Sequence, residues 1–206
     1  MDFDKRAKDW DKDQQKVQRA EILAAEIIKY FSSRPFEHVF EFGCGTGLIS
    51  YFLRDNFKHF TLADNSAGMI EVVNEKIKNE GLKNMVALHI DLTHQIPEIQ
   101  KQDLIFAFMS LHHVLDLDEI FDAFYKLLKP GGYLCIADLD EEDGSFHYKH
   151  PEFKGHYGFS RNKIETLYKK HGFDVEHYRI FYTIIKQVEN TCKDYPLFMA
   201  VGKKVG

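Results

Sequence analysis

The chain has 206 residues, of which 44% are hydrophobic and 29% charged, and its formal net charge is −5. These values are typical of one globular domain, and the acidic balance provides no electrostatic footprint for nucleic acid or an anionic membrane. The three cysteines lie far apart without a C-x-x-C pair, which argues against a disulfide framework or a zinc site. No apolar run approaches the roughly 20 residues that span a bilayer, and the first 16 residues are too polar for a signal peptide. We therefore expect a cytoplasmic protein.

Residues 1–35 precede the first predicted strand. The highly charged residues 1–13 are expected to form a loose arm around Phe3 and Trp10. From Gln14 to Ser32 the apolar positions recur at helical spacing, which predicts a helix that ends before Pro35.

Residues 36–138 alternate short apolar runs with helical patterns. Strands are predicted at 38–42, 60–63, 85–90, 104–109 and 133–137, and helices after the first strand, at 67–80 and at 118–128. This alternation implies right-handed β-α-β units, and the continuous apolar runs indicate a sheet covered on both faces. The predicted fold is therefore α/β, with a doubly wound and mostly parallel sheet.

Residues 139–159 break this rhythm with a polar insert rich in histidine and aromatic residues. Because the insert leaves the sheet at its carboxyl edge, we predict a lid over a substrate pocket, to which His147, Tyr148 and Tyr157 would contribute. The alternative is a small satellite core packed on the closing strands. Residues 160–206 then predict a helix at 160–170 and two strands, about 174–186 and 197–203, that pair as an antiparallel hairpin. The whole of 1–206 is thus read as one domain.

The segment E-F-G-C-G-T-G at 41–47 lies between the first strand and a helix. Its glycines allow a tight turn and close approach of a ligand, and the helix amides beyond them point at that ligand. The dinucleotide fingerprint G-x-G-x-x-G is not met, since Leu48 occupies the sixth position. Glu41 places a carboxylate at the mouth of the loop, which would repel a pyrophosphate and attract the ammonium of a methionine moiety. The loop favours a sulfonium cofactor over a dinucleotide.

Two aspartates follow the next strands. Asp64 ends the second strand and could accept hydrogen bonds from both ribose hydroxyls; otherwise it caps the next helix, where Asn65 and Ser66 compete for that role. Asp91 follows the third strand and could accept from an adenine amino group, or simply form a turn before Thr93.

Together these segments resemble the class I S-adenosylmethionine-dependent methyltransferases, of the small-molecule type found in ubiquinone and menaquinone biosynthesis. The matching segments are E-F-G-C-G-T-G (41–47), L-A-D-N-S-A-G-M-I (62–70), H-I-D-L (89–92), D-L-I-F-A-F-M-S-L-H-H-V (103–114) and K-P-G-G (129–132). The resemblance implies a seven-stranded sheet with an antiparallel last strand, S-adenosyl-L-methionine as cofactor, and an N-terminal aromatic arm over it. The cofactor contacts expected on this basis are Trp10, Glu41, Gly43, Cys44, Gly45, Thr46, Gly47, Asp64, Asn65, Met69, Asp91, Leu92, Ala107 and Phe108.

The histidines allow two interpretations. His112 and His113 follow the fourth strand at the ligand-binding edge, where one could act as a general base, or one could pack under the cofactor while the other starts a helix. His147, His150 and His156 suggest a metal site, but no carboxylate-rich helical spacing accompanies them, so we predict no metal.

The sequence thus predicts in-line methyl transfer to a small-molecule acceptor, with neither nucleic acid nor membrane as partner and the oligomeric state open. The aligned stretch at 108–111 lacks the Asn-Pro-Pro-Tyr typical of amino-group methylation, and the acceptor atom stays open. A binding protein without turnover and a macromolecule methyltransferase are the alternatives. An oxidoreductase is disfavoured by Glu41 and Leu48.

Overall fold

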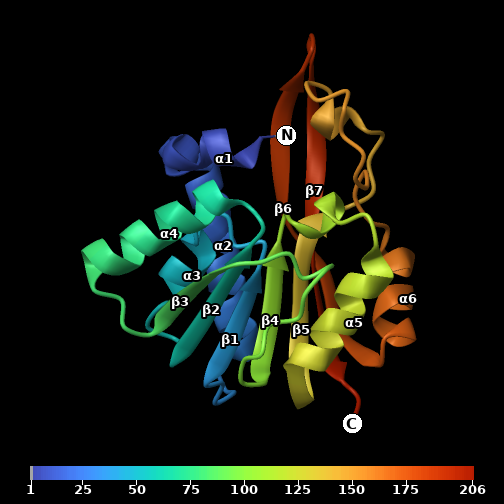
Figure 1. The fold of residues 1–206 in the computed structure, drawn as a ribbon. Coiled ribbons are helices and arrows are strands. Elements are labelled where there is room, and N and C mark those ends of the chain that lie inside the picture. Colours follow the sequence, from blue (N-terminus) through green and yellow to red (C-terminus); the bar gives the residue numbers. More distant parts are fainter. Residues whose placement is uncertain (1) are drawn as a thin grey trace.

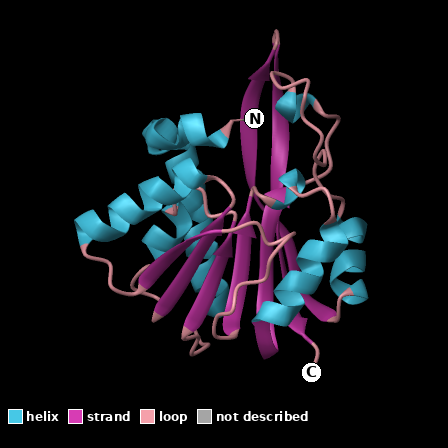
Figure 2. Cartoon of the chain, viewed as in Figure 1, coloured by secondary structure: helices cyan, strands magenta, loops and turns pink. Residues whose placement is uncertain are grey.

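The computed structural model describes residues 2–206, which form a seven-stranded sheet with helices on both faces (Figures 1 and 2). The strand order is β3-β2-β1-β4-β5-β7-β6, and β7 is the one strand of residues 2–206 that runs opposite to the others. The strands are β1 (His38–Phe42), β2 (His59–Asp64), β3 (Met85–His89), β4 (Gln102–Phe108), β5 (Leu128–Leu139), β6 (Phe173–Val188) and β7 (Thr191–Lys204). The predicted fold class is confirmed, including the antiparallel last strand.

The helices lie in two layers. They are α1 (Phe3–Arg6), α2 (Gln14–Phe31), α3 (Leu48–Leu53), α4 (Ala67–Glu80), α5 (Leu117–Leu127) and α6 (Arg161–Lys170), with short 3-10 turns η1 (Ala7–Lys12), η2 (Leu111–His113) and η3 (Ser145–His147). The apolar faces of α2, α3 and α4 cover one side of the sheet, and those of α5 and α6 cover the other. Strand β4 serves both layers, because Leu104 and Phe106 point to one side and Ile105 to the other. None of the helices among residues 2–206 is long and apolar enough to cross a bilayer.

The N-terminal arm is more ordered than the sequence suggested. Within residues 2–13, where a loose arm was expected, the structure forms α1 and η1. Two aspartates attach these turns to the rest of the protein: Asp4 accepts from Ser66 Oγ (2.6 Å) and Gly68 N (2.8 Å), and Asp11 accepts from Thr46 Oγ1 (2.5 Å). The charged residues that suggested a loose segment thus include the two that attach it to the rest of the protein. We call residues 2–13 the N-terminal strap.

The closing strands are longer than predicted. Their far ends, residues 182–188 and 191–196, form a two-stranded ribbon that extends past the other strands (Figure 1). This part of β7 does not show the apolar alternation typical of a strand, because it contains the consecutive charged residues Lys193 and Asp194 and, at its end, Pro196. The β5–β7 pairing supports only residues 197–203 of β7, so the ribbon needs other partners.

The insert supplies those partners. Asp143 pairs with Lys193 (2.7 Å), and the Ser145 and Tyr195 hydroxyls are 2.7 Å apart. Phe146 packs edge-on against the Tyr195 ring, and Tyr148 joins the same apolar cluster. The insert is therefore fixed to the ribbon as a satellite core, and the two form a wall beside the carboxyl edge of the sheet.

Candidate cofactor and acceptor site

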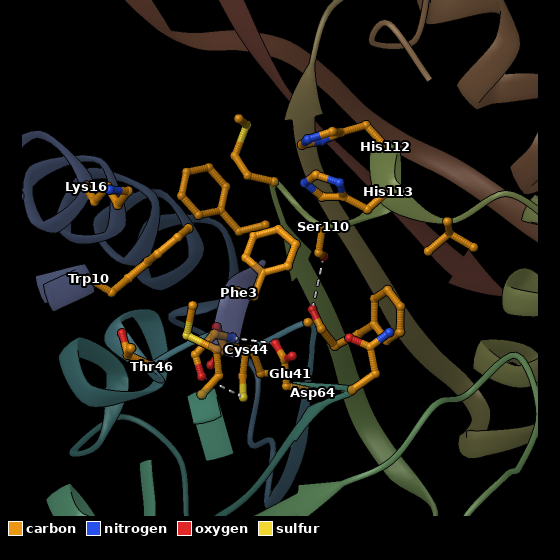
Figure 3. A pocket seen from close by; sticks show the side chains of 18 of the residues that line it. Phe3, Trp10, Lys16, Glu41, Cys44, Thr46, Asp64, Ser110, His112 and His113 are labelled. Carbon is orange, nitrogen blue, oxygen red and sulfur yellow. Dashed lines mark hydrogen bonds between the residues drawn. The ribbon is translucent and has the colours of Figure 1, made fainter. Parts of the chain in front are cut away.

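A cavity of about 810 Å³ opens at the carboxyl ends of β1 to β4 and continues to the ribbon and the insert. This volume is in the range of small-molecule binding sites, roughly 300–1,000 Å³. Figure 3 shows Glu41 and Asp64 at the sheet edge and Phe3 between them and the pair His112 and His113. The cavity therefore has two ends, one formed by the glycine loop and the strand edges, the other by η2, α2, the insert and β6.

The glycine loop exposes its backbone to the first end. Gly43, Gly45 and Gly47 have φ of +62°, +53° and +73°, a region that side chains disfavour. A Cβ on Gly43 would lie 2.4 Å from Ser110 Cβ, and one on Gly47 would lie 2.9 Å from Leu62 Cδ2, so both are required by close packing. A Cβ on Gly45 would meet no atom within 4 Å. Gly45 is thus the position at which bare backbone faces open cavity.

Glu41 lies beneath this loop and is 2% exposed. Its carboxyl accepts from Ser50 Oγ (2.5 Å) and Ser50 N (3.3 Å). Burial raises the pKa of Glu41 to about 8, against the opposing effect of the Ser50 hydrogen bonds. A cationic group brought to this carboxyl would favour its charged form.

The carboxylate of Asp64 supports the loop. Its oxygens accept from Gly45 N (2.8 Å) and Ser66 N (2.9 Å), while Ser66 itself caps α4 through Met69 N (3.2 Å). The helix-cap role therefore belongs to Ser66. Each Asp64 oxygen retains acceptor capacity toward the cavity, since a carboxylate oxygen can accept two hydrogen bonds.

Asp91 forms the expected turn and also lines the cavity. Its Oδ1 accepts from Thr93 N (3.0 Å) and Thr93 Oγ1 (2.6 Å), so the turn role is present. That Asp91 also accepts a hydrogen bond from the adenine amino group stays a prediction.

The residues at this end fit S-adenosyl-L-methionine by their chemistry. A buried carboxyl whose pKa is raised matches an ammonium group, and open backbone at Gly45 with Asp64 beside it matches a polar sugar and carboxylate. Met69 and Leu92 add apolar surface for a base.

Three histidines converge at the other end of the cavity. His112 is 1% exposed and its Nδ1 lies 2.6 Å from Asp138 Oδ1. Asp138 also accepts from the backbone N–H groups of His112 (3.1 Å) and Leu139 (2.8 Å). With both carboxylate oxygens accepting, Nδ1 of His112 carries the proton and Nε2 is left with the lone pair.

His113 and His147 complete this cluster. Burial and the neighbouring histidines hold the pKa of His113 far below its usual range and lower that of His147 to about 4, so both rings are neutral at pH 7. The ligand nitrogens of the three rings lie within 4.8 Å of one another, a grouping that could hold a metal ion. The metal alternative considered from the sequence grouped His147 with His150 and His156, whereas the structure groups it with His112 and His113. His150 lies 3.2 Å from Glu152, and His156 donates its backbone N–H to the His112 carbonyl.

A profile of the methyltransferase domain family matches residues 15–178. The chain belongs to this family. An uncharacterized methyltransferase of Schizosaccharomyces pombe is 32% identical over 145 residues, which cover 64% of this chain and 51% of that protein. The chain thus spans about half the length of this curated relative.

Solved structures show the same methyltransferase fold. A Bacillus halodurans protein with a provisional methyltransferase assignment superposes with a TM-score of 0.76 at 13% identity, over 89% of this chain and 99% of that one. A phosphoethanolamine N-methyltransferase of Haemonchus contortus, solved with S-adenosyl-L-methionine, gives 0.74 at 17% identity, over 89% and 52%.

Most predicted site residues line the cavity of this methyltransferase domain. From the predicted cofactor set these are Trp10, Glu41, Gly43, Cys44, Gly45, Thr46, Asp64, Asn65, Met69, Asp91, Leu92 and Phe108, and from the other sets His112, His113 and His147. Gly47 and Ala107 do not line the cavity. Tyr148 packs on the ribbon and Tyr157, 49% exposed, lies over Gly144; neither lines the cavity.

The N-terminal strap closes one side of the cavity. Phe3 packs edge-on against Trp10 (6.0 Å between ring centroids) and against His113 (5.2 Å). The ammonium of Lys16 lies over the Trp10 ring, 4.4 Å from its centroid.

Sequence reasoning missed several lining residues of the second end, among them Arg19, Lys149 and Lys186. No motif contains them, and lysine and arginine are scattered along the chain, so no local pattern could have found them.

Proposed function

We propose that this chain is an S-adenosyl-L-methionine-dependent methyltransferase that transfers the methyl group in line to a small-molecule acceptor. The observation that carries the proposal is the continuity of the cavity. One space joins the acid-lined glycine loop to the hydrogen-bonded pair His112–Asp138.

When bound, the cofactor supplies a methyl group on a positively charged sulfur. Glu41 would bind the ammonium of its methionine moiety, Asp64 the ribose hydroxyls, and Asp91 with Asn65 the adenine edge. Met69 and Leu92 would pack on the nucleoside, the backbone at Phe108 would face the methionine end, and Trp10 with Phe3 would exclude water. Holding two partners in line supplies much of such an acceleration, since oriented pairs reach effective molarities of roughly 10⁵–10⁸ M.

His112 is the group for proton removal where the acceptor is protonated. Asp138 orients the ring, and Nε2 would take the acceptor proton while Nδ1–H donates to the carboxylate. His113, whose pKa is far too low for this, would instead hold Phe3 in place.

The chain is divided by task in this proposal. Residues 1–35 cover the cofactor, 36–138 bind it, 139–159 form part of the acceptor wall, and 160–206 complete the sheet and carry the ribbon. The acidic net charge favours a small-molecule acceptor over nucleic acid, and a cytoplasmic location is consistent with the unpaired cysteines.

The test is transfer of label from methyl-labelled S-adenosyl-L-methionine to a small-molecule extract of cells that make the protein. We expect Asp138→Asn to lower turnover by about 10²–10⁴-fold, the usual contribution of a positioned acid–base group. The affinity for S-adenosylhomocysteine should be unchanged, and the variant's activity should recover as the pH rises. A protein that binds S-adenosylhomocysteine but labels no compound would be a binding protein without turnover.

A further inference from the structure

Three cations from separate elements reach the second end of the cavity. Arg19 comes from α2, Lys149 from the insert and Lys186 from the ribbon part of β6. They are close enough for the charges of Lys149 and Arg19 to lower the pKa of Lys186, after the larger effect of its burial. Burial also lowers the pKa of Arg19. The fold thus gathers like charges on one wall.

None of the three cations forms an ion pair with a described residue. Within residues 2–206, no carboxylate oxygen lies within 4.0 Å of them. Two acids act on them from farther away: the charge of Asp13 opposes the effect of burial on the pKa of Arg19, and that of Glu142 opposes it for Lys186. Among the described residues, the ammonium of Lys186 donates to the Phe146 carbonyl and lies 4.4 Å from the centroid of the Phe146 ring.

Such a grouping of cations costs free energy. Half-buried cations lose hydration, and like charges repel, unless an anion arrives to pair with them. Of the carboxyl groups that line the cavity, Glu41, Asp64 and Asp91 lie at the edges of β1 to β3, and the others, Asp13, Asp116 and Glu119, lie at the starts of α2 and α5. The three cations lie at the end away from the strand edges, which we call the basic end.

The walls beside the basic end are apolar. Ile184, Ile185, Phe146 and Met109 line the cavity between these cations and the histidine cluster. We propose that Arg19 and Lys186, with Lys149 at the rim, form a subsite for the carboxylate or phosphate of an acceptor whose apolar body lies along this wall. This inference rests on the proposed function and adds the charge class of the acceptor.

A first experiment separates the extract by charge before the labelling reaction. We expect the labelled compound in the fractions retained by an anion-exchange resin at neutral pH. In the double variant Arg19→Gln, Lys186→Gln, kcat/KM for that compound should fall by about a hundredfold or more, because each lost charged hydrogen bond costs about tenfold or more. S-adenosylhomocysteine affinity should stay unchanged. The matched control is Lys169→Gln, a charge removal on the exposed face of α6. Label in the unretained fractions would overturn the proposal.

A second experiment needs no turnover. The protein saturated with S-adenosylhomocysteine is titrated with phenyl phosphate, benzoate and neutral benzamide. At least one anion should bind more tightly than benzamide, and the double variant should lose this preference; the anion preferred identifies the head group. Equal binding of all three, or a preference that the double variant retains, would contradict the subsite. Failure of S-adenosylhomocysteine to bind at all would instead contradict the proposed function.

Discussion

Glu41 is a buried acid whose charge depends on what binds beside it. Its pKa of about 8 means that in the free protein the carboxyl holds its proton at pH 7. A bound ammonium would lower this pKa, so binding releases a proton and the affinity rises with pH until about 8.

We therefore expect the Kd for S-adenosylhomocysteine to fall by up to about tenfold per pH unit between about pH 6 and 7.5. Calorimetry in buffers of different ionisation enthalpy would report the released proton. Glu41→Gln should weaken binding and abolish both the pH slope and the proton release. A pH-independent affinity in the unchanged protein would rule out contact between this carboxyl and a cation.

Asp64 accepts a hydrogen bond from the glycine loop and is proposed to bind the ribose hydroxyls, and substitutions can separate these two roles. Asp64→Ala should weaken S-adenosylhomocysteine binding by about 1.5–3 kcal/mol, the scale of hydrogen bonds to a charged group. Asp64→Asn keeps one oxygen for the Gly45 amide and should lose less. The exposed acid Asp55 provides a control in Asp55→Asn. Unchanged affinity in Asp64→Ala would leave the residue only as a brace for the loop.

At the residue scale, the predictable part of the site is the part encoded locally. Glu41 is the last but one residue of β1 and Asp64 is the last residue of β2, so the sheet edge that holds them can be inferred from the chain order. Arg19 and Lys186 meet only because α2 and the ribbon enclose the same space, and no short segment contains that information. The grouping of His147 with His112 has the same origin.

At the scale of elements, detachment of the N-terminal strap should change the rate at which the ligand dissociates. Its contacts to α4 and the glycine loop depend on Asp4 and Asp11. In Asp4→Ala, Asp11→Ala the strap should detach more often, because three short hydrogen bonds and the Lys76–Asp11 ion pair (2.5 Å) are lost.

S-adenosylhomocysteine should then dissociate faster, while the melting temperature without ligand changes little. Stopped-flow displacement measures the rate, and Asp9→Ala, in the same strap but paired only with Lys12, is the control. Equal dissociation rates in all three proteins would mean that the strap does not cover the ligand.

The elements also show which sequence signals are reliable. Strands β1 to β4 were placed within two residues, since buried parallel strands are short continuous apolar runs. Strand β5 begins at Leu128, five residues before the predicted start, because its first residues include the Lys129-Pro130-Gly131-Gly132 segment, which carries no apolar run. The strap was mispredicted because its order comes from tertiary hydrogen bonds of charged side chains. The ribbon was underestimated because its outer half is stabilised by the insert, through Lys193 and Tyr195, and carries no alternation of its own.

At the scale of the whole molecule, ligand binding should raise the free energy of unfolding and the melting temperature. At a concentration about 100 times its Kd, S-adenosylhomocysteine would stabilise the native state by about 2.7 kcal/mol. For a chain of this size that corresponds to roughly 5–10 °C in melting temperature. NAD should produce no shift, because the glycine loop lacks the dinucleotide fingerprint, with Leu48 in place of its third glycine. A shift with NAD and none with S-adenosylhomocysteine would contradict the cofactor assignment.

The place of β7 between β5 and β6 has a consequence for how the chain folds during synthesis. Phe198 and Ala200 belong to one core layer, and Met199 and Val201 to the other, so both layers are incomplete until this strand is made. Until the ribosome has added residues 191–204, β5 presents an unpaired edge and β6 has no neighbour in the sheet. Open edges and exposed apolar surface invite association with other chains. Pairing of β7 with β5 therefore removes an edge at which other chains could associate.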